Sequence, residues 1–262
     1  MLKAMMIAFS TYSRIPMPQI GWEKENMRYT LCIFPLVGAV TGLCSVLAFW
    51  LLRRLGAGSG LICAVLTALP ILINGGIHMD GFMDTMDAKR SYKSREEKLR
   101  ILKDPHAGAF AILSCGLYLV VSFGLFGEIT EKEIRYVAAG YILSRTLSGL
   151  SVVTLRKART DGMAAGTADA AWPGVKWVLA VWLAAVGGYT AVSGSHPGRG
   201  GSAGRRTVLL ALPPHGLPDV WRNNRRPGWI FPAGLRTGSA VRAGGREPCG
   251  ERKLNGYNSA KC

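Results

Sequence analysis

The chain has 262 residues, of which 49% are hydrophobic and 18% are charged, and its formal net charge is +16. This composition excludes a wholly disordered chain, and it excludes one water-soluble core that spans the whole length. The charge is unevenly distributed, because residues 1–194 carry 20 Lys and Arg against 13 Asp and Glu, whereas residues 195–262 carry 12 against 3. The sequence therefore predicts two regions, 1–194 and 195–262. No CxxC pair occurs among the six cysteines, so no zinc site is indicated.

The first region begins with a short apolar run and continues with five long ones. Met1 to Pro18 lacks the long apolar centre of a signal peptide, and it is predicted to be a short interfacial helix that ends before Pro16. Each of the five following runs is close to the roughly 20 residues that a helix needs to cross about 30 Å of hydrocarbon. These runs are Leu31–Leu52, Leu61–Ile77, Ala109–Gly127, Ile134–Leu155 and Val175–Val192. They mostly lack a polar stripe, so the fold class predicted is all-α, a polytopic helical membrane protein with about five spans.

Basic residues in the connecting segments predict the orientation. The segment before the first span and the second and fourth connections together carry 14 Lys and Arg, whereas the first and third connections carry 4. Because the more basic side of a membrane protein faces the cytoplasm, the connection from Met79 to Gly108 is expected to be cytoplasmic. The chain is then expected in the cell inner (plasma) membrane as a multi-pass protein.

That second connection carries a regular set of acids. Asp80, Asp84 and Asp87 are spaced i, i+4 and i+7, so they fall on one face of a helix and are expected to converge. Hard cations such as Mg²⁺ take carboxylate oxygens together with substrate phosphates, and the three acids are therefore candidate metal ligands. The alternative is that they pair only with the basic run that follows, which begins at Lys89.

A short helix and a polar loop complete the connection. Ser94 and Glu97 form a predicted capping box, and the helix they start is expected to stop at Asp104-Pro105. Its basic residues would meet either a phosphate-bearing substrate or anionic lipid. Lys103 and Asp104, just before the third span, are candidates for binding a phosphate and a metal ion respectively, although an ordinary interfacial loop would have the same composition.

These motifs resemble a known enzyme family. The stretches GGIHMDGFMDTMDA and REEKLRILKDPHAGAFAIL are similar to those of the cobalamin synthase (adenosylcobinamide-GDP ribazoletransferase) family. Phe9 to Pro18, FPLVG from Phe34, Ser144-Arg145 and the stretch from Ala158 to Ala164 also fit its pattern in order. The match runs from about residue 9 to about residue 190, and several motifs in order make it specific.

The resemblance implies a reaction and roles for particular residues. α-Ribazole, or its 5′-phosphate, would attack adenosylcobinamide-GDP, giving adenosylcobalamin, or its 5′-phosphate, and GMP. It implies a Mg²⁺ cofactor held by Asp80, Asp84 and Asp87, with one of these or Asp104 taking the proton of the attacking hydroxyl. No nucleic-acid partner is expected, and the oligomeric state is left open.

Further residues are candidates beside the acids. His78 is a candidate base or partner of the acids, or else a polar anchor at the interface. Arg145 is a charge within a span, which predicts a phosphate contact, or else an interhelical bond to backbone carbonyls. Lys103 and Arg14 complete the expected substrate-binding set.

The second region departs from the family pattern. Residues 195–262 contain 19 Gly and Pro and no span-length apolar run, whereas the family continues with more apolar helix and a late glycine-rich acidic motif. The sequence predicts a disordered tail that is out of frame from about residues 188–200, which would leave the transferase region incomplete and could leave the chain inactive. The alternative is a basic arm for nucleic acid or anionic lipid, with Trp and Arg interleaved only from Trp221 to Trp229.

Two other functions fit some of the same residues. A CDP-alcohol phosphotransferase also uses aspartates with Mg²⁺ at the membrane surface, but the Ala-Arg pair and downstream acid spacing of its motif are absent here. A small cation transporter would place its acids within the spans, whereas these three acids follow a span.

Overall fold

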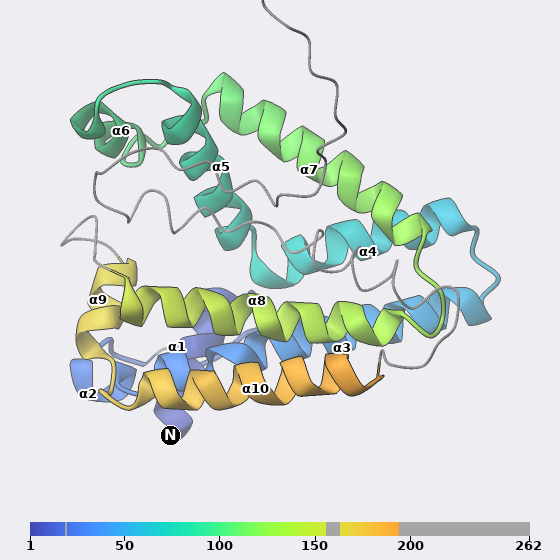
Figure 1. Cartoon of the computed structure of the whole chain (residues 1–262), viewed down its shortest axis with the longest axis horizontal. Helices are drawn as coiled ribbons and strands as arrows, with labels where there is room; N and C mark the ends of the chain where they lie inside the picture. The colour runs from blue at the N-terminus through green and yellow to red at the C-terminus, as the bar shows by residue number, and fades with distance from the viewer. Residues whose placement is uncertain (19, 156–162, 194–262) are drawn as a thin grey trace, which may run out of the picture. The chain divides into compact units, whose positions relative to one another are not determined.

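The computed structural model describes residues 1–18, 20–155 and 163–193, all of which belong to one compact unit. Every regular element in these ranges is a helix, as predicted (Figure 1). The helices are α1 (Leu2–Tyr12), α2 (Lys24–Met27), α3 (Thr30–Arg54), α4 (Ser59–Asn74), α5 (Ile77–Arg90), α6 (Arg95–Ile101), α7 (Ala109–Gly127), α8 (Ile134–Thr154), α9 (Met163–Ala170) and α10 (Val175–Ser193). The tail 195–262 and the loop motif around Arg159 lie outside the described residues.

Four helices are long and apolar enough to cross a membrane, namely α3, α7, α8 and α10. They match four of the predicted spans, which confirms a polytopic helical membrane protein. The span predicted over Leu61–Ile77 differs: α4 ends at Asn74, and it meets the span test only together with α5, to which it is bent by 95°. Gly75 and Gly76, with φ of +64° and +80°, make this elbow, since left-handed backbone is easily adopted by glycine.

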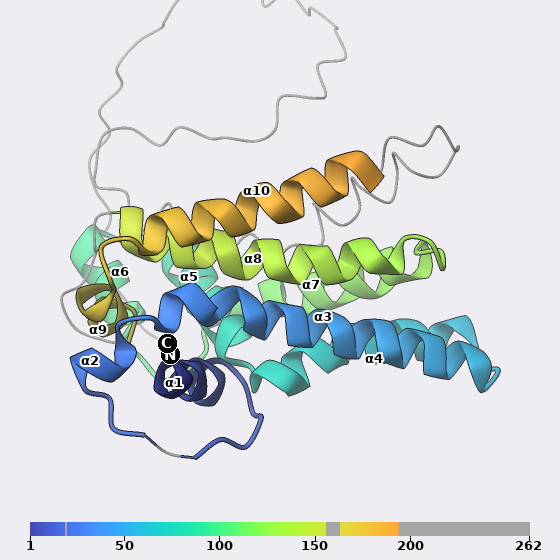
Figure 2. The same cartoon turned by 90° about the horizontal axis from the view of Figure 1, so that it is seen from below.

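The tightest packing joins α3 to α8. Figures 1 and 2 show α3, α8 and α10 running side by side, with α8 in contact with both others. A Cβ at Gly42 would lie 2.7 Å from Ala138 Cα, and one at Gly38 would lie 2.5 Å from the carbonyl oxygen of Tyr141. Because Cβ atoms do not fit there, the two glycines allow the helix backbones to approach closely, as small residues do in membrane bundles.

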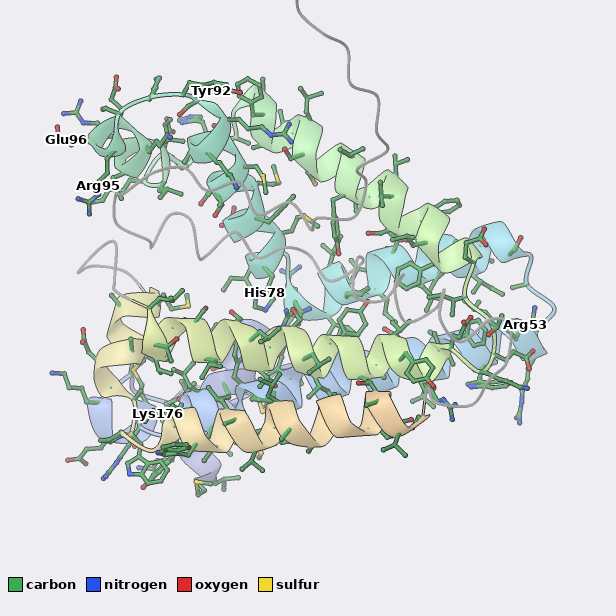
Figure 3. All side chains as sticks on the ribbon, viewed as in Figure 1. Arg53, His78, Tyr92, Arg95, Glu96 and Lys176 are labelled. Carbon is green, nitrogen blue, oxygen red and sulfur yellow. The ribbon has the colours of Figure 1, made fainter. Side chains whose placement is uncertain are left out.

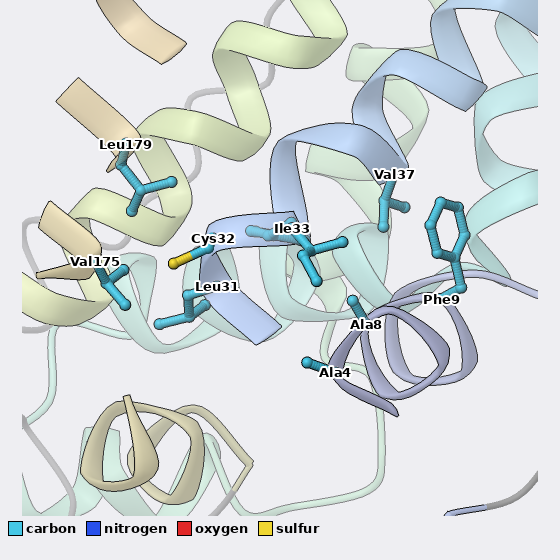
Figure 4. Close-up of a cluster of buried hydrophobic side chains, with 10 residues drawn as sticks. Ala4, Ala8, Phe9, Leu31, Cys32, Ile33, Val37, Val175 and Leu179 are labelled. Carbon is cyan, nitrogen blue, oxygen red and sulfur yellow. The ribbon is translucent and has the colours of Figure 1, made fainter. Parts of the chain in front are cut away.

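The amphipathic helix α1 is anchored to the bundle by its apolar side. Ala4, Ala8 and Phe9 belong to one buried cluster with residues of α3 and with Val175 and Leu179 of α10 (Figure 4). The helix predicted at the N-terminus is therefore confirmed, and its buried face packs on protein. This packing fixes where the following segment, including Arg14, meets the rest of the chain.

The second connection folds into α5, α6 and a loop that leads into α7. Ser94 Oγ accepts a hydrogen bond from the Glu97 N–H, and the Glu97 carboxylate accepts one from the Ser94 N–H, so the predicted capping box is confirmed. α7 then returns along α5 and α4. Tyr92, Arg95 and Glu96 lie at one end of the helices and Arg53 at the other (Figure 3).

Candidate functional site

Arg14 is brought to the elbow between α4 and α5. Its backbone N–H donates a 2.7 Å hydrogen bond to the carbonyl oxygen of Ile73. Its side chain crosses Gly75, where an added Cβ would lie 2.6 Å from Arg14 Cγ. The glycine thus makes the left-handed turn and also leaves room for the arginine. The structure therefore places this candidate beside the start of the acidic helix.

His78 lies in the first turn of α5, in aromatic surroundings. Its ring is stacked with that of Tyr12, with centroids 6.1 Å apart, and it is tilted against Phe34 at 6.0 Å. Figure 3 shows His78 at the end of α5 that faces α8. The ring is thus held by α1 and α3, on the side of α5 that faces the bundle.

The three aspartates share the other side of α5. Asp80 is exposed, whereas Asp84 and Asp87 are partly buried, and buried Phe82, Thr85 and Ala88 face the protein. The charges of Asp80 and Asp87 both act on Asp84, so the three carboxylates are electrostatic neighbours. Like charges at helical spacing repel, and a bound cation would relieve that repulsion.

The three carboxylates are not a ready-made cage. Within residues 1–18, 20–155 and 163–193, no three His, Cys, Asp or Glu side chains are grouped so that they alone would hold a metal ion. The predicted convergence on one point is therefore not seen. The reason is geometric, because residues i, i+4 and i+7 are spread over two turns of helix, about 10 Å along the axis.

Asp87 joins the acidic helix to the loop before α7. Its carboxylate packs directly against Gly108, where an added Cβ would collide with both carboxylate oxygens. Gly108 is the N-cap residue of α7, so this acid lies at the positive end of that helix dipole. Two motifs that are some 20 residues apart in the sequence thereby meet at one place.

Lys103 and Asp104 are exposed residues of the loop that leads to Gly108. Asp104 Oδ1 accepts hydrogen bonds from the His106 N–H at 3.0 Å and the His106 ring Nδ1 at 2.8 Å. These two hydrogen bonds hold the pKa of Asp104 below its usual value, and the bond from the His106 backbone has the larger effect. Asp104 is thus a charged carboxylate that shapes its own loop.

Arg145 lies on the other side of α5, inside the bundle. It is 4% exposed, and it lines a cavity of about 50 Å³ together with His78, Tyr118 and Tyr141. Asp80, Asp84 and Asp87 do not line this cavity. The three aspartates on the one hand, and His78 with Arg145 on the other, therefore lie on opposite sides of α5.

Sequence reasoning did not single out Asn74, Tyr118 and Tyr141, which also line the cavity. Tyr118 and Tyr141 lie within apolar runs, where a tyrosine is easily taken for a lipid-facing aromatic. A buried tyrosine hydroxyl needs a hydrogen-bond partner, and a position that faces lipid tails offers none. A tyrosine inside an apolar run therefore indicates a helix face that is turned toward polar groups of the protein. Asn74, directly before the two glycines, marks the end of α4.

The fold and this polar region define the class of the protein: a polytopic helical membrane protein with an acidic helix bent out from an apolar one. The chain belongs to the cobalamin-5-phosphate synthase family, whose model matches residues 4–214. This match supports the resemblance seen in the sequence motifs. It extends past residue 194, where the first region was predicted to end. No solved structure matches the chain.

Three curated relatives that the chain is similar to share one name. The chain is 49% identical over 170 residues to an adenosylcobinamide-GDP ribazoletransferase of Lachnoclostridium phytofermentans, covering 65% of each protein. It is 34% identical to the enzyme of that name from Clostridium perfringens strain SM101, covering 58% of this chain and 61% of the relative. A Shewanella amazonensis relative of the same name is 32% identical, with 56% of each covered. The matches thus span less than two thirds of these relatives.

Proposed function

We propose that the chain is an adenosylcobinamide-GDP ribazoletransferase. It would join α-ribazole, or its 5′-phosphate, to adenosylcobinamide-GDP and release GMP. The observation that carries the proposal is the contact of Asp87 with Gly108, which unites the acidic helix and the KDPHAG loop in one site. The family match favours this function over a CDP-alcohol phosphotransferase or a cation transporter.

The chemistry is a displacement at a pyrophosphate. A ribose hydroxyl of α-ribazole forms a new O–P bond to the phosphorus nearest cobinamide, the P–O–P bridge breaks, and GMP leaves with the bridging oxygen. The hydroxyl proton passes to a carboxylate of the site, one of the three aspartates or Asp104. Such a step needs alignment and charge neutralisation more than covalent help from the protein.

Mg²⁺ fits the donors of the acidic face, where Asp84 with one of its neighbours, Asp80 or Asp87, would hold it. One or two carboxylates with substrate phosphates are its usual ligands, so a face without a closed cage suits an ion shared with the pyrophosphate. When bound, the ion would neutralise charge on the phosphate oxygens. Exposed Lys103, in the loop that leads to Gly108, would bind a phosphate of the substrate.

Arg14 and His78 would position the start of α5. Arg14 crosses Gly75 at the elbow, and His78 is held between the rings of Tyr12 and Phe34. His78 therefore serves better as a positioning residue for α5 than as the base, since its ring lies on the side away from the acids. Its replacement by Gln would shift the elbow.

The location proposed is the cell inner membrane, with the site in the cytoplasm. The Lys and Arg count of the connections supports this orientation. The α5–α6 end of the bundle, where Arg95 lies, and the end that carries Arg53 are opposite each other (Figure 3). Nucleotide substrates and Mg²⁺ would be available at the cytoplasmic end.

GMP release by membrane vesicles that contain the chain tests the proposal. The vesicles receive adenosylcobinamide-GDP, α-ribazole and Mg²⁺, and a version of the chain whose reading frame is corrected after about residue 188 is assayed in parallel. We expect Asp84→Asn to lower the rate by about 100-fold or more, because it removes a charged ligand of the Mg²⁺ that would neutralise the reacting phosphates. Glu131→Gln, an acid-to-amide change at the opposite end, is the matched control and should retain activity. Failure of both the original and the corrected chain to release GMP would exclude the proposed function.

A further inference from the structure

Arg145 is a buried cation for which the described part of the chain supplies no carboxylate. Among the described residues its one hydrogen bond is from Nη1 to Ser144 Oγ at 3.3 Å, and its buried Nε has no acceptor there. The titratable groups that act on it are the phenols of Tyr141 and Tyr118, which carry no negative charge at neutral pH. A guanidinium inside a helix of this apolar kind is costly unless an anion or several acceptors compensate it.

The cavity beside Arg145 has the size of one small anion. Its volume is about 50 Å³, whereas one water needs about 10–15 Å³ on this scale, so it holds a few waters or one tetrahedral oxyanion. It is formed where the elbow between α4 and α5 meets α7 and α8. Asn74 and His78 come from the elbow, Tyr118 from α7, and Tyr141, Ser144 and Arg145 from α8.

The chemistry of the lining selects an anion. None of the lining residues is an Asp or a Glu, and the polar ones include a guanidinium and two phenols, which can donate hydrogen bonds. Ile71, Met79 and Phe82 form apolar walls, which strengthen an ionic contact by excluding water. The planar guanidinium matches two oxygens of a phosphate at once and leaves a third for a tyrosine hydroxyl.

We propose that this cavity is a phosphoryl-binding site, in which Arg145 binds one phosphate group and Tyr118 and Tyr141 support it. The site is separate from the acidic face, because Asp80, Asp84 and Asp87 lie on the other side of α5 and do not line it. The phosphate comes either from a phospholipid headgroup or from a water-soluble phosphorylated compound. The two sources present the same chemistry to the arginine.

The test is binding of inorganic phosphate to the full chain in a detergent that has no phosphate. Thermal unfolding is followed while phosphate is raised against chloride of equal ionic strength. At ten times the dissociation constant, we expect phosphate to raise the Tm by about 3–6 °C. Arg145→Gln should lose this rise. Arg53→Gln, which removes an exposed arginine at the far end of the bundle, should keep it.

A milder variant covers the case in which Arg145→Gln does not fold. Tyr118→Phe keeps the ring and removes only the hydroxyl, and we expect it to weaken phosphate binding several-fold. No phosphate effect beyond that of chloride on the unmodified chain would overturn the proposal. Equal phosphate binding by Arg145→Gln, or by Tyr118→Phe when the arginine variant is unfolded, would also overturn it.

Native mass spectrometry of the purified chain distinguishes the two phosphate sources. A phospholipid that is retained by the unmodified chain and lost in Tyr118→Phe or Arg145→Gln identifies a lipid headgroup. A lipid-free chain that binds inorganic phosphate identifies a soluble compound. Either result supports the site, and both are independent of GMP release, which depends on Asp84.

Discussion

At the scale of single residues, Gly108 is the position where the two halves of the acidic site touch. The carboxylate of Asp87 occupies the space that any side chain at 108 would need. The glycine is therefore required by close approach, since its φ of −79° is open to every residue. An alanine would push Asp87 away from the N-terminus of α7 and displace the acidic face.

Gly108→Ala should lower GMP release by about 100-fold with little loss of folded protein, since misplacement by about 1 Å has effects of this size. The measurement is the rate of GMP release beside the yield and Tm of the purified chain. Gly116→Ala, in the same helix with nothing near its Cβ, is the matched control. If both variants were equally active, Gly108 would have no part in positioning Asp87.

The carboxyl group of Asp104 allows a prediction about its pKa. Its pKa is lowered mainly by the backbone N–H of His106 and further by the ring. His106→Ala keeps the first bond and removes the second, so we expect the Asp104 pKa to rise but to stay below its usual value. NMR titration of the carboxyl carbon measures it.

The lowered pKa of Asp104 also determines how the stability of its loop depends on pH. Because the folded-state pKa lies below the unfolded one, the contribution of Asp104 is fully present above the ordinary Asp pKa. It is lost as the pH falls through the lowered value. The protection of the His106 amide against hydrogen exchange, relative to an unstructured peptide at the same pH, should therefore fall only in strongly acidic solution. An unchanged pKa in His106→Ala would show that the ring bond has no effect.

At the scale of elements, the contact of α3 with α8 depends on glycines that leave no room for a methyl group. Gly38 packs on the backbone of Tyr141 and on the Arg145 side chain, and Gly42 packs on Ala138. The helix α8, which bears Arg145, is thus held at a close distance from α3.

Gly42→Ala should destabilise the bundle by about 1–3 kcal/mol, because added volume in a closely packed contact forces the helices apart. Thermal unfolding in detergent would record the loss as a lower Tm. Gly124→Ala in α7, where nothing lies within 4 Å of the new Cβ, should be neutral or slightly stabilising. A Gly42→Ala variant as stable as the parent would mean that α3 and α8 can separate without cost.

How far the sequence predicts the elements depends on the signals at their ends. α7 was predicted with its observed bounds because Asp104-Pro105 and Gly108 end the preceding segment and an apolar run follows at once. The capping box likewise marked the start of α6. The elbow after Asn74 is not predicted by the apolar run, which continues to Ile77, whereas the chain bends by 95° at the left-handed Gly75 and Gly76. The contact of Asp87 with Gly108 is tertiary, and no spacing rule predicts it.

At the scale of the whole molecule, an ion pair joins two connecting segments that are far apart in the sequence. Arg53 Nη2 and Glu131 Oε1 are 2.7 Å apart, so the end of α3 and the segment before α8 lie on the same side. Both side chains are about half exposed, and the pair therefore adds little stability. Tyr92, between α5 and α6, lies at the opposite end of the helices (Figure 3).

Cysteine labelling of intact cells tests this arrangement in a chain whose own cysteines are changed to Ala. Leu55→Cys and Lys132→Cys are expected to react with a membrane-impermeant reagent added outside. Tyr92→Cys should react only after the cells are opened, because the basic connection is expected in the cytoplasm. Opposite reactivity of Leu55→Cys and Lys132→Cys would contradict the observed pairing of the two connections.

The 95° elbow has a consequence for how deep the acids sit in the bilayer. Had α4 continued straight, the carboxylates at positions 80, 84 and 87 would have been staggered by about 10 Å along the membrane normal. Because the chain turns there, α5 runs nearly at a right angle to α4. With α4 along the membrane normal, all three acids would therefore lie at about the same depth.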